Sequence, residues 1–150
     1  MLHTIEIQRV MSAPAITAKG SETLTAIRKL MKDREINHLP IVDDANMPIG
    51  IISALDLMQL SDWRMRFKDL ARTGALRDET LFDSLLAEEI MVRPVRSIPL
   101  TANIKEAADV IEGQRIHCLP VTNETGSIVG IITAHDLLRL AYQNENPEQV

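Results

Sequence analysis

The sequence predicts a mixed α/β (α+β) fold made of two β-α-β-β-α repeats with a helical insert between them. Residues 50–57 read GIISALDL, and residues 130–137 read GIITAHDL. The same spacing of 80 residues holds without a gap when residues 10–60 are aligned with residues 90–140. Runs of β-branched residues alternate with segments of helical periodicity in both copies. The chain is therefore expected to fold as two similar half-domains.

Each repeat begins with a methionine and, three residues later, a proline: Met11 and Pro14, then Met91 and Pro94. We expect a short extended segment at residues 15–17 and again at residues 95–98. Ser21 and Thr101 are the expected N-caps of the helix that follows. That helix has one apolar face in each copy, formed by Leu24, Ile27, Leu30 and Met31 in the first and by Ile104, Ala107, Ala108 and Ile111 in the second.

A β-hairpin follows the first helix of each repeat. Its first strand is expected at residues 39–42 and 119–122, and its return strand at residues 49–52 and 128–132. The residues between them have turn chemistry, DDAN in one copy and NETG in the other. A second helix is expected directly after Ser53 and after Thr133.

The insert between the repeats is expected to be helical. Leu60, Trp63, Phe67 and Leu70 form one stripe, Gly74 is the expected break, and Leu81, Phe82, Leu85 and Leu86 form another stripe. The insert holds the single tryptophan and both phenylalanines of the chain. These rings either cover the two half-domains or form a surface for an oligomer or a partner, because aromatic residues are enriched at interface cores. The expected boundaries are 8–60 for repeat 1, 61–88 for the insert, 89–142 for repeat 2 and 143–150 for a flexible tail.

Composition excludes several classes of function. The formal net charge of −5 argues against nucleic-acid binding, which needs clustered lysine and arginine. No apolar run is long enough to span a membrane, and the first residues show no secretory signal. One cysteine, Cys118, cannot form an internal disulfide, so we expect a cytoplasmic protein. Cys118 is expected to be a small buried hydrophobic residue rather than a nucleophile.

The repeated Ser/Thr-x-x-Asp motif has two interpretations. It is the pattern of a capping box, in which hydroxyl and carboxylate satisfy free N–H groups at a helix start. It also suits a nucleotide, because a helix N-terminus favours phosphate and a carboxylate can accept both hydroxyls of a ribose. Gly50 and Gly130 precede the motif in both copies, where an absent Cβ permits close approach by a ligand or another strand. Capping and ligand binding can occur at the same residues.

Together, Met-x-x-Pro, His/Cys-Leu-Pro and Gly-Ile-Ile-Ser/Thr-x-x-Asp-Leu resemble a tandem pair of CBS domains, the regulatory modules named after cystathionine β-synthase. The resemblance covers nearly all of residues 8–142, and the chain plan is similar to small stand-alone CBS pairs. It implies that the two copies pack through their sheets with pseudo-two-fold symmetry. It further implies two clefts that bind adenosyl compounds such as AMP, ADP, ATP, S-adenosylmethionine or NAD.

The resemblance also implies that each cleft takes residues from both copies. One cleft would consist of Ser53, Asp56, Ser97, Ile98, His117, Cys118, Leu119 and Pro120. The other would consist of Thr133, His135, Asp136, Thr17, Ala18, Asn37, His38, Leu39 and Pro40. In each cleft the aspartate would hold the ribose, the Ser or Thr would reach the phosphate, and the Leu-Pro strand would line the base.

The two expected clefts are not equally equipped for a phosphate. His38 and His135 stand where family members that bind phosphate commonly carry Arg, Lys or His, whereas the other cleft has Cys118 and Leu55 there. We therefore expect an anionic ligand, AMP in particular, at Thr133, His135 and Asp136. A weaker ligand, or none, is expected at Ser53 and Asp56. No arginine stands at these positions, which disfavours tight binding of a triphosphate.

The sequence thus predicts a regulatory, energy-sensing module that is not an enzyme, needs no cofactor and binds no metal. It signals to an unidentified protein partner through changed packing of its repeats or of a homodimer. No histidine pair has the spacing of a zinc site, and no nucleophile–base arrangement can be read around Cys118. The alternative is a module that binds no ligand and serves for dimerisation or for docking a partner protein.

Overall fold

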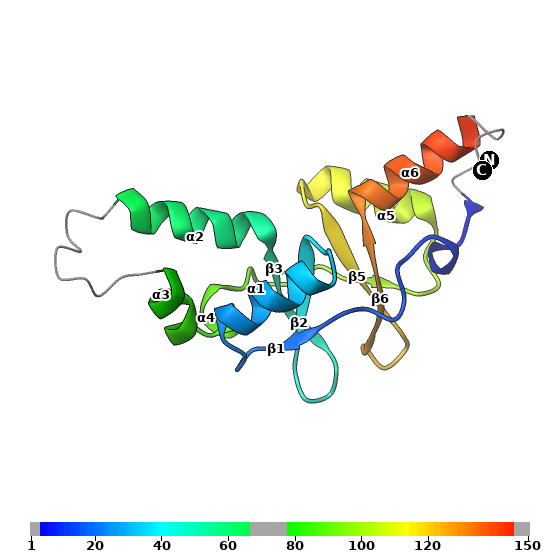
Figure 1. Ribbon diagram of the computed structural model, residues 1–150. Helices are drawn as coiled ribbons and strands as arrows, with labels where there is room; N and C mark the ends of the chain where they lie inside the picture. Colours follow the sequence, from blue (N-terminus) through cyan, green and yellow to red (C-terminus); the bar gives the residue numbers. More distant parts are fainter. Residues whose placement is uncertain (1–3, 67–77, 146–150) are drawn as a thin grey trace. The chain divides into compact units, whose positions relative to one another are not determined.

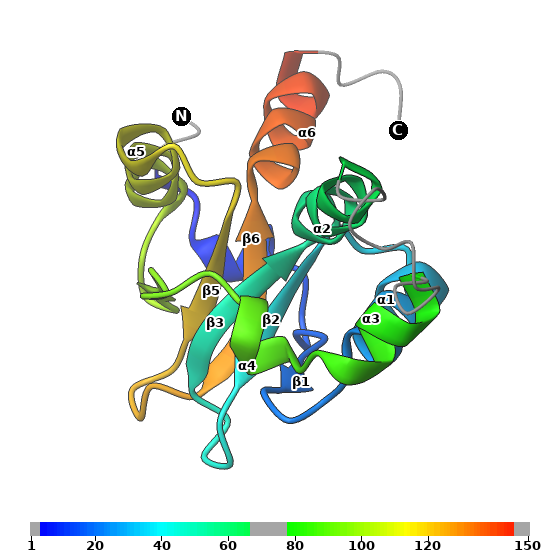
Figure 2. The same cartoon turned by 90° about the vertical axis from the view of Figure 1, so that its left-hand side faces the viewer.

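The computed structural model describes residues 4–66 and 78–145 (Figures 1 and 2). Their contacts divide the chain into two units. The repeat-1 unit comprises residues 17–95, and the repeat-2 unit comprises residues 1–16 and 96–150. Each unit contains one three-stranded sheet with helices, so the prediction of a mixed α/β fold is confirmed.

The repeat-1 unit has a sheet in the order β1-β2-β3, in which β1 is parallel to β2 and β2 is antiparallel to β3. Helix α1 follows the first strand, α2 follows the third, and two shorter helices complete the unit. Its elements are β1 (Ala18–Lys19), α1 (Leu24–Asp33), β2 (His38–Val42), β3 (Pro48–Ser53), α2 (Ala54–Arg66), α3 (Asp78–Ser84) and α4 (Ala87–Ile90).

The repeat-2 unit repeats this topology in the order β4-β5-β6, with the same parallel and antiparallel pairings. A short 3₁₀ helix near the N-terminus of the chain belongs to it as well. Its elements are η2 (Ile7–Arg9), β4 (Ile98–Pro99), α5 (Ile104–Gln114), β5 (Cys118–Thr122), β6 (Ile128–Thr133) and α6 (Ala134–Glu145).

Both hairpins form where the sequence predicts them, and they share one register. Ile41 pairs with Gly50 in the first hairpin, as Val121 pairs with Gly130 in the second. The predicted apolar helix faces are also confirmed: Leu24, Ile27 and Met31 are buried on α1, and Ile104, Ala107 and Ile111 on α5. Leu30 and Ala108 are half-buried at the margins of these faces.

Two predictions about the start of each repeat are wrong. The first strand starts three residues later than the predicted extended segment in both repeats, at Ala18–Lys19 and at Ile98–Pro99, and only Ile98 lies within the predicted range. The N-caps are Thr23 and Asn103 rather than Ser21 and Thr101. A distant segment fixes both helix starts, because Leu24 N–H donates to the Leu85 carbonyl over 2.9 Å and Ile104 N–H donates to the Ile5 carbonyl over 2.9 Å.

Those two pairings extend the repeat beyond the aligned residues, because positions 5 and 85 are also 80 residues apart. The segment that leads each repeat contacts the unit that holds the other repeat's sheet. Ser12 forms a β-bridge with Ile131 in the repeat-2 unit, and Val92 forms one with Ile51 in the repeat-1 unit. Ile7 is fully buried in the core of the repeat-2 unit, together with Ile98, Ala102, Ala107, Ile111, Leu119, Val121 and Ile132.

These leading segments also explain the two glycines. A Cβ on Gly50 would lie 2.3 Å from Met91 Sδ, and a Cβ on Gly130 would lie 2.6 Å from Met11 Sδ. Of the two roles that the sequence left open, the glycines therefore serve close approach of another segment of the chain. Each methionine of a Met-x-x-Pro motif fills the space above a glycine.

The insert is helical in its described parts. Helix α2 continues into it as far as Arg66, and Phe82 of α3 is fully buried against the repeat-1 unit. The guanidinium carbon of Arg28 lies 4.4 Å from the centre of the Phe82 ring. For Phe82, the interpretation as cover for a half-domain is thus confirmed. Trp63 has no described side chain, and Phe67, Leu70 and Gly74 lie outside the described residues.

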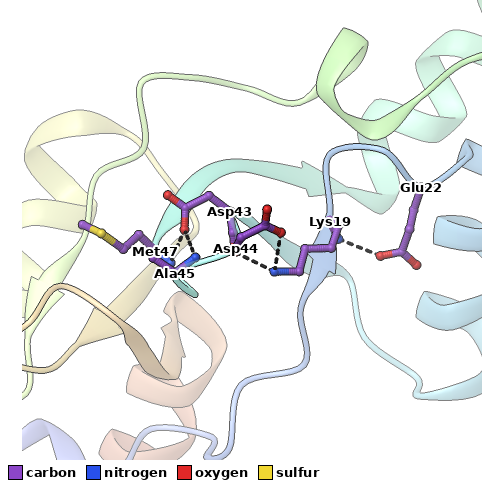
Figure 3. A network of polar contacts seen from close by, with 6 residues as sticks. All are labelled: Lys19, Glu22, Asp43, Asp44, Ala45 and Met47. Atoms are coloured by element: carbon purple, nitrogen blue, oxygen red, sulfur yellow. Dashed lines mark hydrogen bonds and ion pairs between the residues drawn. The ribbon is translucent and has the colours of Figure 1, made fainter.

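A polar network joins the edge strand of the repeat-1 unit to its hairpin turn (Figure 3). Lys19 Nζ donates to the Asp43 carbonyl over 2.6 Å and lies 3.6 Å from Asp44 Oδ1. Asp43 Oδ1 accepts from the N–H groups of Ala45 and Met47, each over 2.9 Å. These bonds fix the turn and the end of β1, so the network has a structural role.

Candidate functional site

The first Ser/Thr-x-x-Asp motif lies where strand β3 becomes helix α2. Ser53 N–H donates to Asp56 Oδ2 over 2.7 Å, and Asp56 N–H donates to Ser53 Oγ over 3.1 Å. This is a reciprocal capping box, so the capping interpretation is confirmed here. Within the described residues, no further hydrogen bond or ion pair is made by the Asp56 carboxylate. One carboxylate oxygen of Asp56 is therefore available to an outside donor.

The second motif forms the same box where strand β6 becomes helix α6. Thr133 N–H and the Thr133 hydroxyl both donate to Asp136 Oδ2 over 2.8 Å, and Asp136 N–H donates to Thr133 Oγ1 over 3.2 Å. Asp136 is the one charged residue among the buried positions of the described chain, with 7% of its surface exposed. A buried carboxylate that accepts two hydrogen bonds from one neighbouring residue has a fixed orientation.

Arg139 distinguishes the second motif from the first, and sequence reasoning missed it. Its Nη2 lies 3.3 Å from Asp136 Oδ1, one helical turn further along α6. Gln59 occupies the equivalent position in repeat 1. The signal was available, because residues three apart on a helix share a face and Arg139 follows Asp136 at that spacing. The second motif therefore has a guanidinium group, that of Arg139, beside its aspartate.

The other predicted site residues of the repeat-1 unit lie beside its motif. His38 pairs with Ser53 across the hairpin, and the Asn37 carbonyl accepts a bond of 2.9 Å from the N–H of Ala54, the first residue of α2. Ala18, Leu39 and Pro40 are buried, and Thr17 and His38 are half-buried. Asn37 is exposed directly at the start of α2.

The repeat-2 unit places its predicted residues in the same way. Cys118 pairs with Thr133, and the His117 carbonyl accepts a bond of 2.9 Å from Ala134 N–H. His117, His135 and Ser97 are exposed, whereas Ile98, Cys118, Leu119 and Pro120 are buried. Leu119 and Ile98 belong to the hydrophobic core of this unit. Each predicted cleft combines residues of both units, and that combination stays a prediction.

Cys118 is 4% exposed, so the prediction that it is a buried residue is confirmed. Burial in apolar surroundings raises the pKa of its thiol to about 12. The thiol is therefore protonated at neutral pH and is a poor nucleophile, because the thiolate is the reactive form. Cys118 therefore serves as a buried packing residue of strand β5 and not as a nucleophile.

The raised pKa of Cys118 makes stability depend on alkaline pH. The pKa of the thiol in the folded chain, about 12, is above the value of ~8.5 for an unfolded chain. Its contribution is complete below ~8.5 and is lost as the pH rises towards the folded pKa. Between pH 8 and 9.5, urea unfolding should show wild type losing about 1 kcal/mol more than Cys118→Ala. Equal losses in both proteins would contradict this assignment.

Among the residues that the structure describes, no three His, Cys, Asp or Glu side chains form a group that could hold a metal ion. None of the helices described is long and apolar enough to cross a membrane.

Solved structures share this fold over nearly the whole chain. A putative acetoin utilization protein from Vibrio cholerae is 27% identical, with a TM-score of 0.77, and the match covers 97% of this chain and 98% of that one. The CBS domain pair of protein MJ0100, solved with 5′-methylthioadenosine and S-adenosyl-L-methionine, is 27% identical with a TM-score of 0.72 and covers 93% and 97%. CBSX2, solved with AMP, is 21% identical with a TM-score of 0.72, covers 95% and 99%, and supports the fold alone.

Curated relatives are longer than this chain. A protein of Methanopyrus kandleri, MK0525, is 26% identical over 93% of this chain, which spans 64% of its length. An L-aspartate semialdehyde sulfurtransferase of Methanocaldococcus jannaschii is 29% identical over 89% of this chain, which spans 23% of its length. The sequence profile of the CBS domain matches residues 7–62 and 87–142, one match for each repeat. With the Ser/Thr-x-x-Asp motifs and the three-stranded sheet of each unit, these matches show that the chain belongs to the CBS domain family and carries two CBS domains in tandem.

Proposed function

We propose that the chain is a regulatory module that binds adenosyl ligands through its two Ser/Thr-x-x-Asp motifs. The observation that carries the proposal is the repeated placement of a capped aspartate where a strand becomes a helix, at Asp56 and Asp136. The CBS pair of MJ0100, 27% identical, was solved with two adenosyl compounds. CBSX2, which shares the fold, was solved with AMP.

Each motif offers the groups that an adenosyl ligand needs. The start of helix α2 or α6 presents the positive end of the helix dipole, which favours phosphate, while the N–H groups of the first and third helical residues already donate within the unit. The aspartate accepts ribose hydroxyls with the carboxylate oxygen that does not cap the helix. The resemblance predicts that further residues contribute to each site, and these contributions stay predictions. They are Thr17, Ala18, Asn37, His38, Leu39 and Pro40 for one site, and Ser97, Ile98, His117, Cys118, Leu119 and Pro120 for the other.

The two motifs should prefer different ligands. In the motif of Thr133, His135 and Asp136, Arg139 lies beside Asp136, so this motif is the better candidate for AMP. Ser53 and Asp56 have Leu55 and Gln59 at the equivalent positions, so their motif suits an uncharged adenosyl compound such as 5′-methylthioadenosine. The proposal thus keeps the difference in ligand preference that the sequence predicts for the two motifs, and Arg139 is a further reason for that difference.

Ligand binding is proposed to act on a partner by changing the packing of the repeats or of a homodimer. A ligand shifts such an equilibrium only by its differential affinity for the two arrangements. The homodimer, the protein partner and the cytoplasmic location stay predictions, and so does the absence of catalysis. The alternative function, dimerisation or docking without a ligand, is tested by the same experiment.

Thermal unfolding with and without AMP, ADP, ATP, S-adenosylmethionine, NAD or 5′-methylthioadenosine tests the proposal. A ligand at ~100 times its dissociation constant adds about 2.7 kcal/mol. For a domain of this size the midpoint then rises by roughly 5–10 °C. No rise with any of these compounds would favour the ligand-free alternative.

Replacing Arg139 should change the preference between ligands. Arg139→Gln is expected to weaken AMP binding by about two- to fivefold, because an exposed cation contributes modestly to phosphate binding. It should leave 5′-methylthioadenosine binding unchanged, since that compound has no phosphate. Isothermal titration with both ligands measures the effect. Equal weakening of both would assign Arg139 to the orientation of Asp136 instead.

A further inference from the structure

A pocket of about 570 Å³ lies within the repeat-1 unit, among α1, α2 and α3. It is formed by the C-terminal half of α1, the turn that follows, the first turns of α2, and one side chain of α3. Its lining includes Arg28, Met31, Lys32, Leu57, Asp62 and Phe82. Its volume is typical of pockets that bind small molecules. Its lining shares Asn37 with the residues proposed for the adenosyl sites, but it includes neither residue of the Ser53 and Asp56 capping box.

Hydrogen bonds within the repeat-1 unit connect the elements that form the walls of this pocket. Helix α1 ends with Ile36 N–H donating to the Met31 carbonyl over 3.0 Å, while Glu35 takes a left-handed φ of 54°. This is the geometry of a Schellman turn. Helix α3 is attached to α1 through a hydrogen bond from Thr25 to Asp83, and the two helices lie side by side in Figures 1 and 2. Preorganised walls reduce the entropy cost of binding.

The base of the pocket is apolar. Phe82 is fully buried, Met31 is 4% exposed and Leu57 is 7% exposed. Met58 lies at the rim with 61% of its surface exposed. An apolar base with a flexible methionine beside it suits a hydrocarbon body, because thioether side chains adapt to irregular shapes.

Arg28 supplies the specific polar group. Its guanidinium stacks on the Phe82 ring at 4.4 Å, and this stacking holds the planar fork of N–H donors in place. No ion pair joins Arg28 to a carboxylate among residues 4–66 and 78–145. A guanidinium fork matches a carboxylate in geometry and can bind both of its oxygens.

The charges of the lining favour a ligand with one negative charge over a multiply charged anion. Arg28 and Lys32 are opposed by Glu35 and Asp62 on the same lining, so the formal charges cancel. A nucleotide phosphate would meet no excess of positive charge, whereas one carboxylate can pair with Arg28 alone. We propose that this pocket binds a small monocarboxylic acid with an apolar body, its carboxylate on Arg28 and its hydrocarbon part against Met31, Leu57 and Phe82.

Titration with 3-phenylpropionate tests the proposal on the full chain labelled with ¹³C at its methionine methyl groups. The signals of Met31 and Met58 should shift on binding, and those of Met11 and Met47, which lie elsewhere, should not. Arg28→Gln should weaken binding about tenfold, because it removes a charged hydrogen-bond donor. The matched control Lys29→Gln, one residue along α1 and outside the pocket lining, should leave the affinity unchanged.

Three results would overturn the proposal. The Met31 and Met58 signals could stay unshifted at millimolar acid, or the methyl ester of the acid could bind as tightly as the acid. The shifts could also arise from dissociation of a dimer, which sedimentation of the same samples would detect. Saturating 5′-methylthioadenosine should not displace the acid. Displacement would show that both ligands bind at one site. Arg28→Lys, which keeps the charge and loses the fork, should bind with intermediate affinity.

Discussion

Asp136→Asn is expected to abolish most AMP binding, with a loss of more than tenfold in affinity. The substitution removes the charge of a residue that is 7% exposed and replaces one of its acceptor oxygens by a donor NH₂ group. Ribose hydroxyls would then face a donor where they require an acceptor, and such a mismatch is costly in a buried site. Isothermal titration with AMP measures the loss.

The same substitution weakens a helix cap, so binding and stability must be separated. Thr23→Ala is the matched control, because Thr23 Oγ1 caps α1 by accepting from Ala26 N–H over 3.2 Å. Both variants should lower the free energy of unfolding by about 1 kcal/mol. Only Asp136→Asn should lose AMP affinity. If Thr23→Ala lost it equally, general destabilisation would account for the effect and Asp136 would be a cap alone.

The structure places both Ser/Thr-x-x-Asp motifs where the sequence predicts them, and it adds which of their atoms are already bonded. From sequence, a capping box and a ribose site are the same pattern, and the resolved bonds at Ser53 and Thr133 show that the cap forms in both copies. What sequence could not show is which acceptor atoms the cap leaves available. One oxygen of Asp56 has no other partner among the described residues, whereas Asp136 Oδ1 lies 3.3 Å from Arg139. That difference depends on side-chain geometry, which repeat alignment does not contain.

The hairpins and helix faces could be predicted because they rest on local periodicity that both copies repeat. The start of each repeat could not, because it depends on a partner segment far along the chain. Ser21 and Thr23 are both good caps by composition, and the bond from Leu24 N–H to the Leu85 carbonyl selects Thr23. Likewise, no local signal shows that Met11 contacts the sheet of repeat 2 rather than that of repeat 1.

Gly50→Ala is expected to lower the free energy of unfolding by about 1–3 kcal/mol through overpacking. The added methyl would lie 2.3 Å from Sδ, 2.5 Å from Cγ and 2.8 Å from Cβ of Met91, so the whole side chain must move. Met91 is 8% exposed and its backbone is bonded to Ala87, which leaves it little room to do so. Urea unfolding of the variant measures the loss.

Gly113→Ala is the matched control, because no atom lies within 4 Å of its added methyl on helix α5. It should be neutral or stabilise the chain by up to about 1 kcal/mol, since alanine is the better helix former. A double-mutant cycle then isolates the contact: Gly50→Ala should cost less in a Met91→Ala background than in wild type. Equal costs in both backgrounds would mean that Met91 is not what excludes a side chain at position 50. The repeated spacing of glycine and methionine within this chain would then need another cause.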